Sequence, residues 1–333
     1  MKVLKFGGTS VGSAQRMKEV AKLITDGERK IVVLSAMSGT TNTLVEISDY
    51  LYKKNPEGAN EIINKLESKY RQHIDELFAT PEYKQKGLEL IKSHFDYIRS
   101  YTKDLFTLFE EKVVLAQGEL ISTAMMNYYL QECGVKSVLL PALEYMRTDK
   151  NAEPDPVYIK DKLQVQLELH PDAEIYITQG YICRNAYGEI DNLQRGGSDY
   201  TASLIGAAIN ASEIQIWTDI DGMHNNDPRI VDKTAPVRHL HFEEAAELAY
   251  FGAKILPPTC IQPAKYANIP VRLLNTMDPT APGTLISNDT EKGKIKAVAA
   301  KDNITAIKIK SSRMLLAHGF LRKVFEIFES YQT

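Results

Sequence analysis

The order of apolar and polar positions predicts a chain in which strands and helices alternate. Apolar runs at 2–6 and 30–36 predict two strands, and the apolar residues between them recur at the spacing of one helix face, which defines a βαβ unit. Further strands are predicted at 135–140, 174–178, 213–218 and 271–274, with helices between several of them. Apolar strands of this kind are typical of a sheet covered on both faces. We therefore predict an α/β fold, a three-layer αβα sandwich with a mainly parallel central sheet.

Two regions interrupt this alternation. From about 55 to 111 the pattern is helical only, which predicts a helical insertion. Its two apolar stripes consist of Ile62, Leu66, Tyr70, Ile74 and Leu77, and of Leu88, Ile91, Phe95 and Ile98. Near the C-terminal end, 294–300 and 305–310 predict strands and 319–331 predicts an amphipathic helix. We predict a large domain over 1–290 and a small segment over 291–333.

Composition narrows the class of protein. The 333 residues are 44% apolar and 25% charged, which suits a globular chain with a substantial core. The net charge of −3 comes without a long run of one sign, and no apolar stretch approaches the roughly 18 residues of a membrane span, so we expect neither a nucleic-acid nor a membrane partner. Three widely spaced cysteines argue against disulfides and a zinc site. Since the N-terminus runs straight into a predicted strand, we expect a cytoplasmic protein.

The first candidate for chemistry is the loop Lys5-Phe6-Gly7-Gly8-Thr9-Ser10-Val11-Gly12. A strand that ends in paired glycines and opens a helix leaves backbone N–H groups free to bind an anion such as phosphate. It is not a Walker A loop, because Ser13 rather than lysine follows Gly12, and Thr9 breaks the dinucleotide-binding pattern. The alternative is a glycine-rich turn with a solvated lysine.

A second glycine pair stands in Arg195-Gly196-Gly197-Ser198-Asp199, just before a predicted helix. Arg195 offers a planar group that pairs with a carboxylate or phosphate, and the glycines let a ligand approach the backbone. Two anion-binding loops indicate a ligand with more than one anionic end. The alternative is that Ser198 or Asp199 only caps a structural helix.

A third polar segment, Thr218-Asp219-Ile220-Asp221-Gly222, follows the predicted strand at 213–218, and Asp227-Pro228-Arg229 comes shortly after it. Open α/β sheets bind nucleotides at the carboxyl ends of their strands. Downstream, Lys254 lies beside Gly252 at the end of a predicted helix. The alternatives are a plain Asp-Gly turn and a lysine that opposes the helix dipole.

Taken together, these segments resemble the aspartokinases of the amino-acid kinase family, in order and over nearly the whole chain. The matching segments are KFGGTSVG at 5–12, SAMSGTTN at 35–42, Gly118-Glu119, RGGSD at 195–199, TDIDG with DPRIV at 218–231, and GAKILPP at 252–258. The resemblance implies a phosphotransferase that moves the γ-phosphoryl group of ATP to the side-chain carboxylate of L-aspartate. The product, 4-phospho-L-aspartate, begins the biosynthesis of lysine, threonine and methionine.

The resemblance also implies residue roles. Lys5 would contact the transferring phosphoryl group and Asp199 would hold Lys5, whereas no general base is needed because the acceptor carboxylate is already ionised. The implied ATP-binding residues are Lys5, Gly7, Gly8, Ser10, Thr218, Asp219, His224, Arg229 and Lys254, with His224 in place of the family's usual tyrosine and Pro257 in place of its histidine. We expect Mg²⁺ to be held by the nucleotide phosphates, without a protein metal ligand.

For the substrate, Arg195 suits the α-carboxylate and Glu119 suits the α-ammonium group of L-aspartate. The implied substrate-binding residues are Ser35, Thr41, Glu119, Tyr181, Arg195, Gly196 and Ser198. Two other functions stay open. A kinase for another carboxylate or carbamate would share Lys5 and Asp199 without needing Glu119 and Arg195, and an amino-acid sensor would bind without turnover.

The segment 291–333 is similar to the first strand and helix of an ACT domain, a module that follows aspartokinase catalytic domains and binds an inhibitory amino acid. We expect lysine or threonine as a feedback ligand, and the chain ends inside the first of the two modules that the family carries. The alternative is that this segment only packs against the larger domain. We also expect a homo-oligomer.

Overall fold

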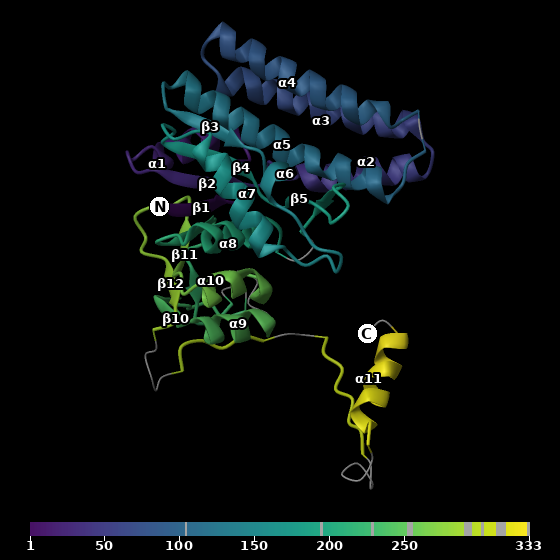
Figure 1. Ribbon diagram of the computed structural model, residues 1–333, viewed down its shortest axis with the longest axis vertical. Coiled ribbons are helices and arrows are strands. Elements are labelled where there is room, and N and C mark those ends of the chain that lie inside the picture. Colours follow the sequence, from purple (N-terminus) through teal and green to yellow (C-terminus); the bar gives the residue numbers. More distant parts are fainter. Residues whose placement is uncertain are drawn as a thin grey trace. The chain divides into compact units, whose positions relative to one another are not determined.

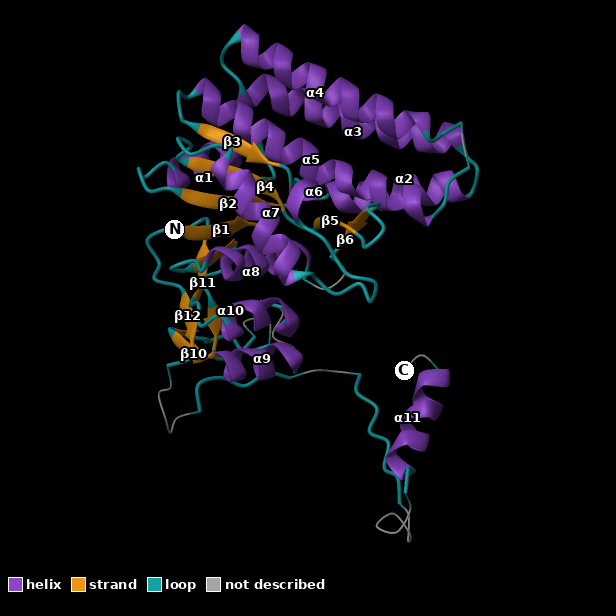
Figure 2. Ribbon diagram, in the orientation of Figure 1, coloured by secondary structure: helices purple, strands orange, loops and turns teal. Residues whose placement is uncertain are grey.

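The computed structural model describes residues 1–103, 105–193, 196–227, 230–251, 256–289, 295–300, 303–310 and 318–331. The chain divides into two compact units, Met1–Ala300 and Lys301–Thr333. Within the described residues of the first unit lies an eight-stranded sheet, which Figures 1 and 2 show with its helices.

The sheet has the strand order β10-β12-β11-β7-β1-β2-β4-β3. From β3 to β11 all neighbours pair in parallel, whereas β12 runs antiparallel to β11. The strands are β1 (Lys2–Phe6), β2 (Lys30–Leu34), β3 (Ser137–Leu140), β4 (Ile175–Gln179), β7 (Ile214–Thr218), β10 (His239–His241), β11 (Val271–Asn275) and β12 (Thr284–Ser287). Two hairpins lie outside the sheet, β5 (Ile182–Arg184) with β6 (Ile190–Asn192), and β8 (Met223–His224) with β9 (Pro236–Val237). The predicted mainly parallel sheet is confirmed.

Helices cover both faces of this sheet. They are α1 (Ala14–Ile24), α2 (Thr40–Tyr52), α3 (Pro56–Leu77), α4 (Pro81–Ser100), α5 (Leu108–Glu132), α6 (Ala142–Tyr145), α7 (Pro156–Glu168), α8 (Gly197–Ile209), α9 (Phe242–Tyr250), the 3₁₀ turn η1 (Pro258–Ile261) and α10 (Gln262–Tyr266). Within the described residues, none of these helices is long and apolar enough to cross a lipid bilayer.

Alternation along the strands explains the three layers. In β1, Leu4 and Phe6 belong to a core shared with α1 to α5, whereas Val3 belongs to a second core shared with α6 to α9. In β2, Leu34 faces the first core and Val33 the second. Successive side chains of a strand point to opposite faces, so each buried strand supplies both cores. The predicted αβα sandwich is confirmed.

The helical insertion is confirmed as the long helices α3 and α4, which pack against each other and against α2 and α5. Both begin with a proline in the first turn behind a capping side chain, Asn55 for α3 and Thr80 for α4. The predicted stripes are buried in the first core except for Ile62 and Leu88, which are half-buried at its edge. The insertion therefore adds a helical layer to the core of the first unit.

At the C-terminal end, two strand predictions are wrong. The described residues 295–300 and 303–310 form no strand, and 303–310 are exposed throughout. An apolar alternation becomes a strand only where a neighbouring strand accepts its backbone hydrogen bonds. The amphipathic helix is confirmed as α11 (Phe320–Ser330), none of whose residues is buried.

Candidate active site

The carboxyl ends of the parallel strands bring several predicted site residues to one edge of the sheet. Lys5 lies near the end of β1, Ser35 directly after β2, and Thr218 at the end of β7. In register, β1 lies between β2 and β7. The strand that follows β1 in the chain, β2, pairs with one edge of β1, and the later strand β7 pairs with the other edge. Open α/β sheets bind ligands at such a switch in strand order.

At this edge Lys5 forms an ion pair with Asp199, with 2.7 Å between Nζ and Oδ1. Lys5 is only 8% exposed, and the two side chains come from β1 and from the first turn of α8. Because little solvent reaches the pair, Asp199 holds the ammonium group in place more firmly than a surface partner would. The pairing that the sequence predicted for these two residues is present.

The amino end of α8 lies beside this ion pair and is built from Gly196 and Gly197. Gly196 has a φ of +81°, and a methyl group there would lie 1.6 Å from the sulfur of Cys260. Only glycine fits both constraints. The first N–H groups of a helix carry a partial positive charge, so this end of α8 suits an anionic ligand next to the Lys5 ammonium group.

The loop after β1 is held by its neighbours on both sides. The Gly7 N–H donates to the carbonyl of Trp217 at 3.4 Å, and the Gly8 carbonyl accepts from the N–H of Ser38 at 3.1 Å. The hydroxyl of Ser10, predicted to bind ATP, is fully buried and shares a 2.7 Å hydrogen bond with the hydroxyl of Thr276. Ser10 therefore anchors the loop to the end of β11.

Glu119 lies on α5 and is 3% exposed. Its Oε1 accepts a 3.3 Å hydrogen bond from the N–H of Ala36, whereas its Oε2 is buried and has no hydrogen-bond partner among the residues that the structure describes. Burial raises the pKa of Glu119 to about 8, because the backbone hydrogen bond from Ala36 offsets the loss of water only in part. A buried carboxyl group with an open oxygen is the environment in which an ammonium ligand would be stabilised.

Hydroxyl groups connect Glu119 to the Lys5–Asp199 pair. Ser35 donates a 2.9 Å hydrogen bond from its hydroxyl to that of Ser198, which precedes Asp199 in the chain. Ser35 also precedes Ala36, the residue that donates to Glu119. A continuous set of contacts thus joins the candidate phosphoryl-binding cation to the candidate ammonium-binding carboxyl group.

Tyr181 follows β4 and borders the same region. It adopts a φ of +69°, and its N–H donates to the Thr201 hydroxyl of α8 at 3.0 Å. Burial raises the pKa of Tyr181 to about 12, with the Glu119 carboxylate adding to the rise. A tyrosine held in this unusual backbone conformation indicates that the packing around it is well determined. Thr41, in the first turn of α2, is half-buried.

Three other residues that are predicted to bind the nucleotide lie at the end of β7 or soon after it. Thr218 exchanges hydrogen bonds of 3.3 Å with the backbone of Ile220, and Asp219 is exposed. His224 lies in the β8–β9 hairpin, where its Nδ1 is 2.8 Å from the Thr234 hydroxyl.

Three predicted site residues lie outside the described residues, namely Arg195, Arg229 and Lys254. Among the residues that are described, no group of three or more His, Cys, Asp or Glu side chains could hold a metal ion.

Sequence reasoning missed residues that support the site through packing. Cys260 contacts the amino end of α8 at Gly196, and Thr276 holds Ser10. Thr40 stands between Ser35 and Thr41 without a predicted role, and the sequence pattern predicts Tyr70 only as a member of an apolar stripe. The hydroxyl of Tyr70 in that stripe was the one available signal, because a buried tyrosine hydroxyl usually finds a partner.

Fold and site together define an α/β protein that presents a cation and a helix amino end at the carboxyl edge of a parallel sheet. The chain belongs to the amino acid kinase family, whose model matches residues 1–275. Aspartokinase 1, chloroplastic, from Arabidopsis thaliana is 38% identical over 98% of this chain and 59% of its own length. Lysine-sensitive aspartokinase 3 from Escherichia coli is 34% identical over 98% of this chain and 73% of its own length.

Among solved structures, the chain is similar to Escherichia coli aspartokinase III in complex with aspartate and ADP. The TM-score is 0.84 at 31% identity, over 100% of this chain and 74% of that one. The chain spans about three fifths of the length of the Arabidopsis thaliana relatives that it matches.

Proposed function

We propose that this protein is an aspartate kinase, which converts ATP and L-aspartate to ADP and 4-phospho-L-aspartate. The observation that carries the proposal is the set of contacts from the Lys5–Asp199 ion pair through Ser198 and Ser35 to the open oxygen of Glu119. It offers a cation for the phosphoryl group and a carboxyl group for an ammonium within one continuous site. The named aspartokinase relatives and the solved complex with aspartate and ADP support the same substrates.

In the proposed reaction, a side-chain carboxylate oxygen of L-aspartate bonds to the γ-phosphorus while the bond to the β,γ-bridging oxygen breaks, and ADP leaves with that electron pair. Negative charge spreads over the oxygens of the transferring group. The Lys5 ammonium, held by Asp199, stabilises this charge without having to reorganise. The acceptor is already ionised, so Asp199 acts as a positioning group rather than a general base.

Each end of the amino acid has a proposed partner. Glu119 pairs with the α-ammonium group, and Arg195, which lies outside the described residues, pairs with the α-carboxylate. The space between these two partners would be lined by the backbone of Gly196 and by the side chains of Ser35, Thr41, Tyr181 and Ser198. A second substrate carboxylate is then left for reaction at the Lys5 side of the site.

We propose that the nucleotide lies along the loops after β1 and β7. Gly7, Gly8 and the amino end of α8 would face phosphate oxygens, and Thr218, Asp219 and His224 would face the nucleoside. Arg229 and Lys254 would add positive charge from outside the described residues. Mg²⁺ would arrive with ATP and supply further charge neutralisation there, because this ion keeps several waters and prefers phosphate oxygens.

The test is a hydroxamate trap for the acyl phosphate with L-aspartate, ATP and Mg²⁺, run beside glutamate, acetylglutamate and carbamate. Hydroxamate that forms with aspartate and not with the others supports the proposal. If ADP is released with a different acid and not with aspartate, that acid is the substrate instead. If no acid is turned over, the result favours an amino-acid sensor.

Glu119 makes aspartate binding dependent on pH. Below its pKa of about 8 the carboxyl group holds a proton that an arriving ammonium must displace, so KM for aspartate should fall as pH rises from about 6 to about 8, by up to about tenfold per unit. One proton should be released on binding, which calorimetry in buffers of different ionisation enthalpy would measure. A KM that stays flat across this range would contradict the assignment.

Regulation, assembly and location follow as parts of the same proposal. Since the Escherichia coli relative is named as lysine-sensitive, we propose lysine as the first feedback ligand to test, with threonine second, acting through the ACT-like segment 291–333. We propose a homo-oligomer, which light scattering would measure on the purified chain. The composition favours the cytoplasm, and cell fractionation would test that compartment.

A further inference from the structure

The helical insertion reaches the wall of the candidate substrate site through two consecutive residues of α3. Tyr70 shares a buried hydrogen bond of 2.8 Å with the hydroxyl of Thr40, the first residue of α2. Lys69 donates from Nζ to the carbonyl of Ser38 at 3.3 Å. Both contacts hold the loop between β2 and α2, the segment that supplies Ser35 and Ala36 to the site.

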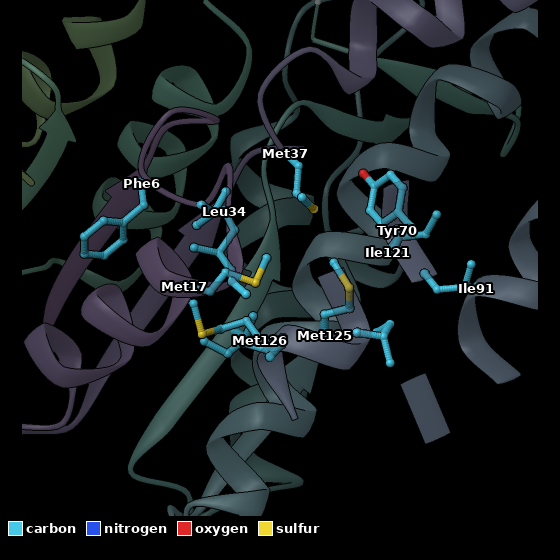
Figure 3. Close-up of a cluster of buried hydrophobic side chains, with 14 of the residues drawn as sticks. Phe6, Met17, Leu34, Met37, Tyr70, Ile91, Ile121, Met125 and Met126 are labelled. Carbon is cyan, nitrogen blue, oxygen red and sulfur yellow. The ribbon is translucent and has the colours of Figure 1, made fainter. Parts of the chain in front are cut away.

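Tyr70 is itself held rigidly. It is fully buried, and the centroid of its ring lies 5.8 Å from the ring centroid of Phe95 on α4, with an angle of 56° between the two ring planes. Figure 3 shows the Tyr70 hydroxyl on the side of the ring that faces the segment carrying Met37. A side chain packed in this way fixes the position of the atom to which its hydroxyl bonds.

Thr40 passes this constraint on to the helix that carries Glu119. A methyl group at Gly118 would lie 2.7 Å from Cβ of Ala36 and 3.2 Å from Cγ2 of Thr40. Since Gly118 has no side chain, α5 packs directly against the loop, and the next residue, Glu119, receives the N–H of Ala36. A continuous series of contacts therefore runs from the Tyr70 hydroxyl through Thr40 and Gly118 to Glu119.

We propose that Tyr70 is a positioning residue for the amino-acid substrate, which holds Thr40 and the loop after β2 so that Glu119 presents its open oxygen to the substrate ammonium group. This inference rests on the proposed function. It gives the helical insertion a role at the site: the insertion sets affinity for the amino acid from behind the loop, without touching either substrate.

The test is Tyr70→Phe, which removes the hydroxyl and keeps the ring. KM for L-aspartate should rise about three- to tenfold, because the loop after β2 loses one buried hydrogen bond, while kcat and KM for ATP stay within about twofold. Thr40→Val should raise KM for L-aspartate by the same factor, whereas Thr40→Ser, which keeps the hydroxyl, should retain most of the affinity. The double variant Tyr70→Phe with Thr40→Val should have a KM for L-aspartate no higher than that of either single variant.

Tyr145→Phe is the matched control. Tyr145 is also fully buried and shares a 2.6 Å hydrogen bond with a threonine hydroxyl, that of Thr178, but it lies in the second core. It should lower the melting temperature by as much as Tyr70→Phe and leave KM for aspartate unchanged. An unchanged KM in Tyr70→Phe, or an equal rise in the control, would overturn the inference. A wild-type protein that makes no acyl phosphate would instead overturn the proposed function.

Discussion

Lys5→Ala is expected to lower kcat by on the order of 100-fold or more, comparable to the loss of a pre-positioned oxyanion donor. The ammonium group lies 2.7 Å from Asp199 in a site with little solvent, so in the proposed reaction its charge would act on the transferring phosphoryl group with little screening. KM for aspartate should change far less, because Glu119 and the loop after β2 are untouched. Single-turnover measurement of acyl phosphate formation separates the chemical step from product release.

Loss of the cation also leaves Asp199 partly buried without its partner, which destabilises the folded state. A double variant, Lys5→Met with Asp199→Asn, separates the two effects. It should regain most of the lost melting temperature, because no uncompensated charge remains, and it should stay as inactive as Lys5→Ala. Recovery of turnover in the double variant would show that the loss came from destabilisation.

Lys30→Met supplies the matched control on the neighbouring strand. Lys30 is 1% exposed and pairs with Asp26, but it lies at the amino end of β2, at the edge opposite the candidate site. It should lower stability and leave kcat unchanged. Near-normal turnover in Lys5→Ala, or an equal loss in Lys30→Met, would remove the role assigned to Lys5.

Local pattern was sufficient to predict the sheet and the long helices. The predicted strand at 2–6 coincides with β1, and that at 213–218 differs from β7 by one residue at its start. Apolar runs of this kind record burial on both faces, which a buried strand in a three-layer fold must have. The same reasoning failed at the described residues 295–300 and 305–310, because a strand also depends on a partner strand that no local pattern reveals.

The candidate site was predictable in its chemistry but not in its packing. A glycine-rich loop with a lysine indicates an anion, and family resemblance paired Lys5 with Asp199. Ser10 stands in the same loop, yet its hydroxyl is joined to Thr276, a residue 266 positions away. The contact between Tyr70 and Thr40 is equally hidden, since a stripe of apolar positions tells which face of α3 is buried and not what its one hydroxyl meets.

The second large effect is expected from Glu119→Gln, which should raise KM for L-aspartate about 30- to 100-fold, since removing one partner of a buried charge pair costs about 2–3 kcal/mol. The amide oxygen can still accept from the N–H of Ala36, so the fold and KM for ATP should be retained. The dependence of KM on pH between about 6 and about 8 should disappear with the carboxyl group.

The same variant should be more stable than the wild type, and the sign follows from the pKa. Burial raises the pKa of Glu119 to about 8 from 4.5, so between these pH values the folded state holds a proton that the unfolded state releases, and wild-type stability falls as pH rises. Glu119→Gln carries no such group. The difference in melting temperature should therefore grow from about pH 4.5 to about pH 8 and then level off.

Glu67→Gln provides the contrast that isolates the site. Glu67 is also a buried carboxylate, but Arg99 and Arg71 pair with it, and their hydrogen bonds outweigh burial and lower its pKa. Its replacement should destabilise the protein near neutral pH and leave KM for aspartate unchanged. The expected pair of results is a more stable Glu119→Gln and a less stable Glu67→Gln, with affinity for aspartate lost only in Glu119→Gln. These results would identify Glu119 as a carboxyl group that is buried at a cost to stability because it binds the substrate ammonium. An unchanged KM in Glu119→Gln would assign its burial to packing instead.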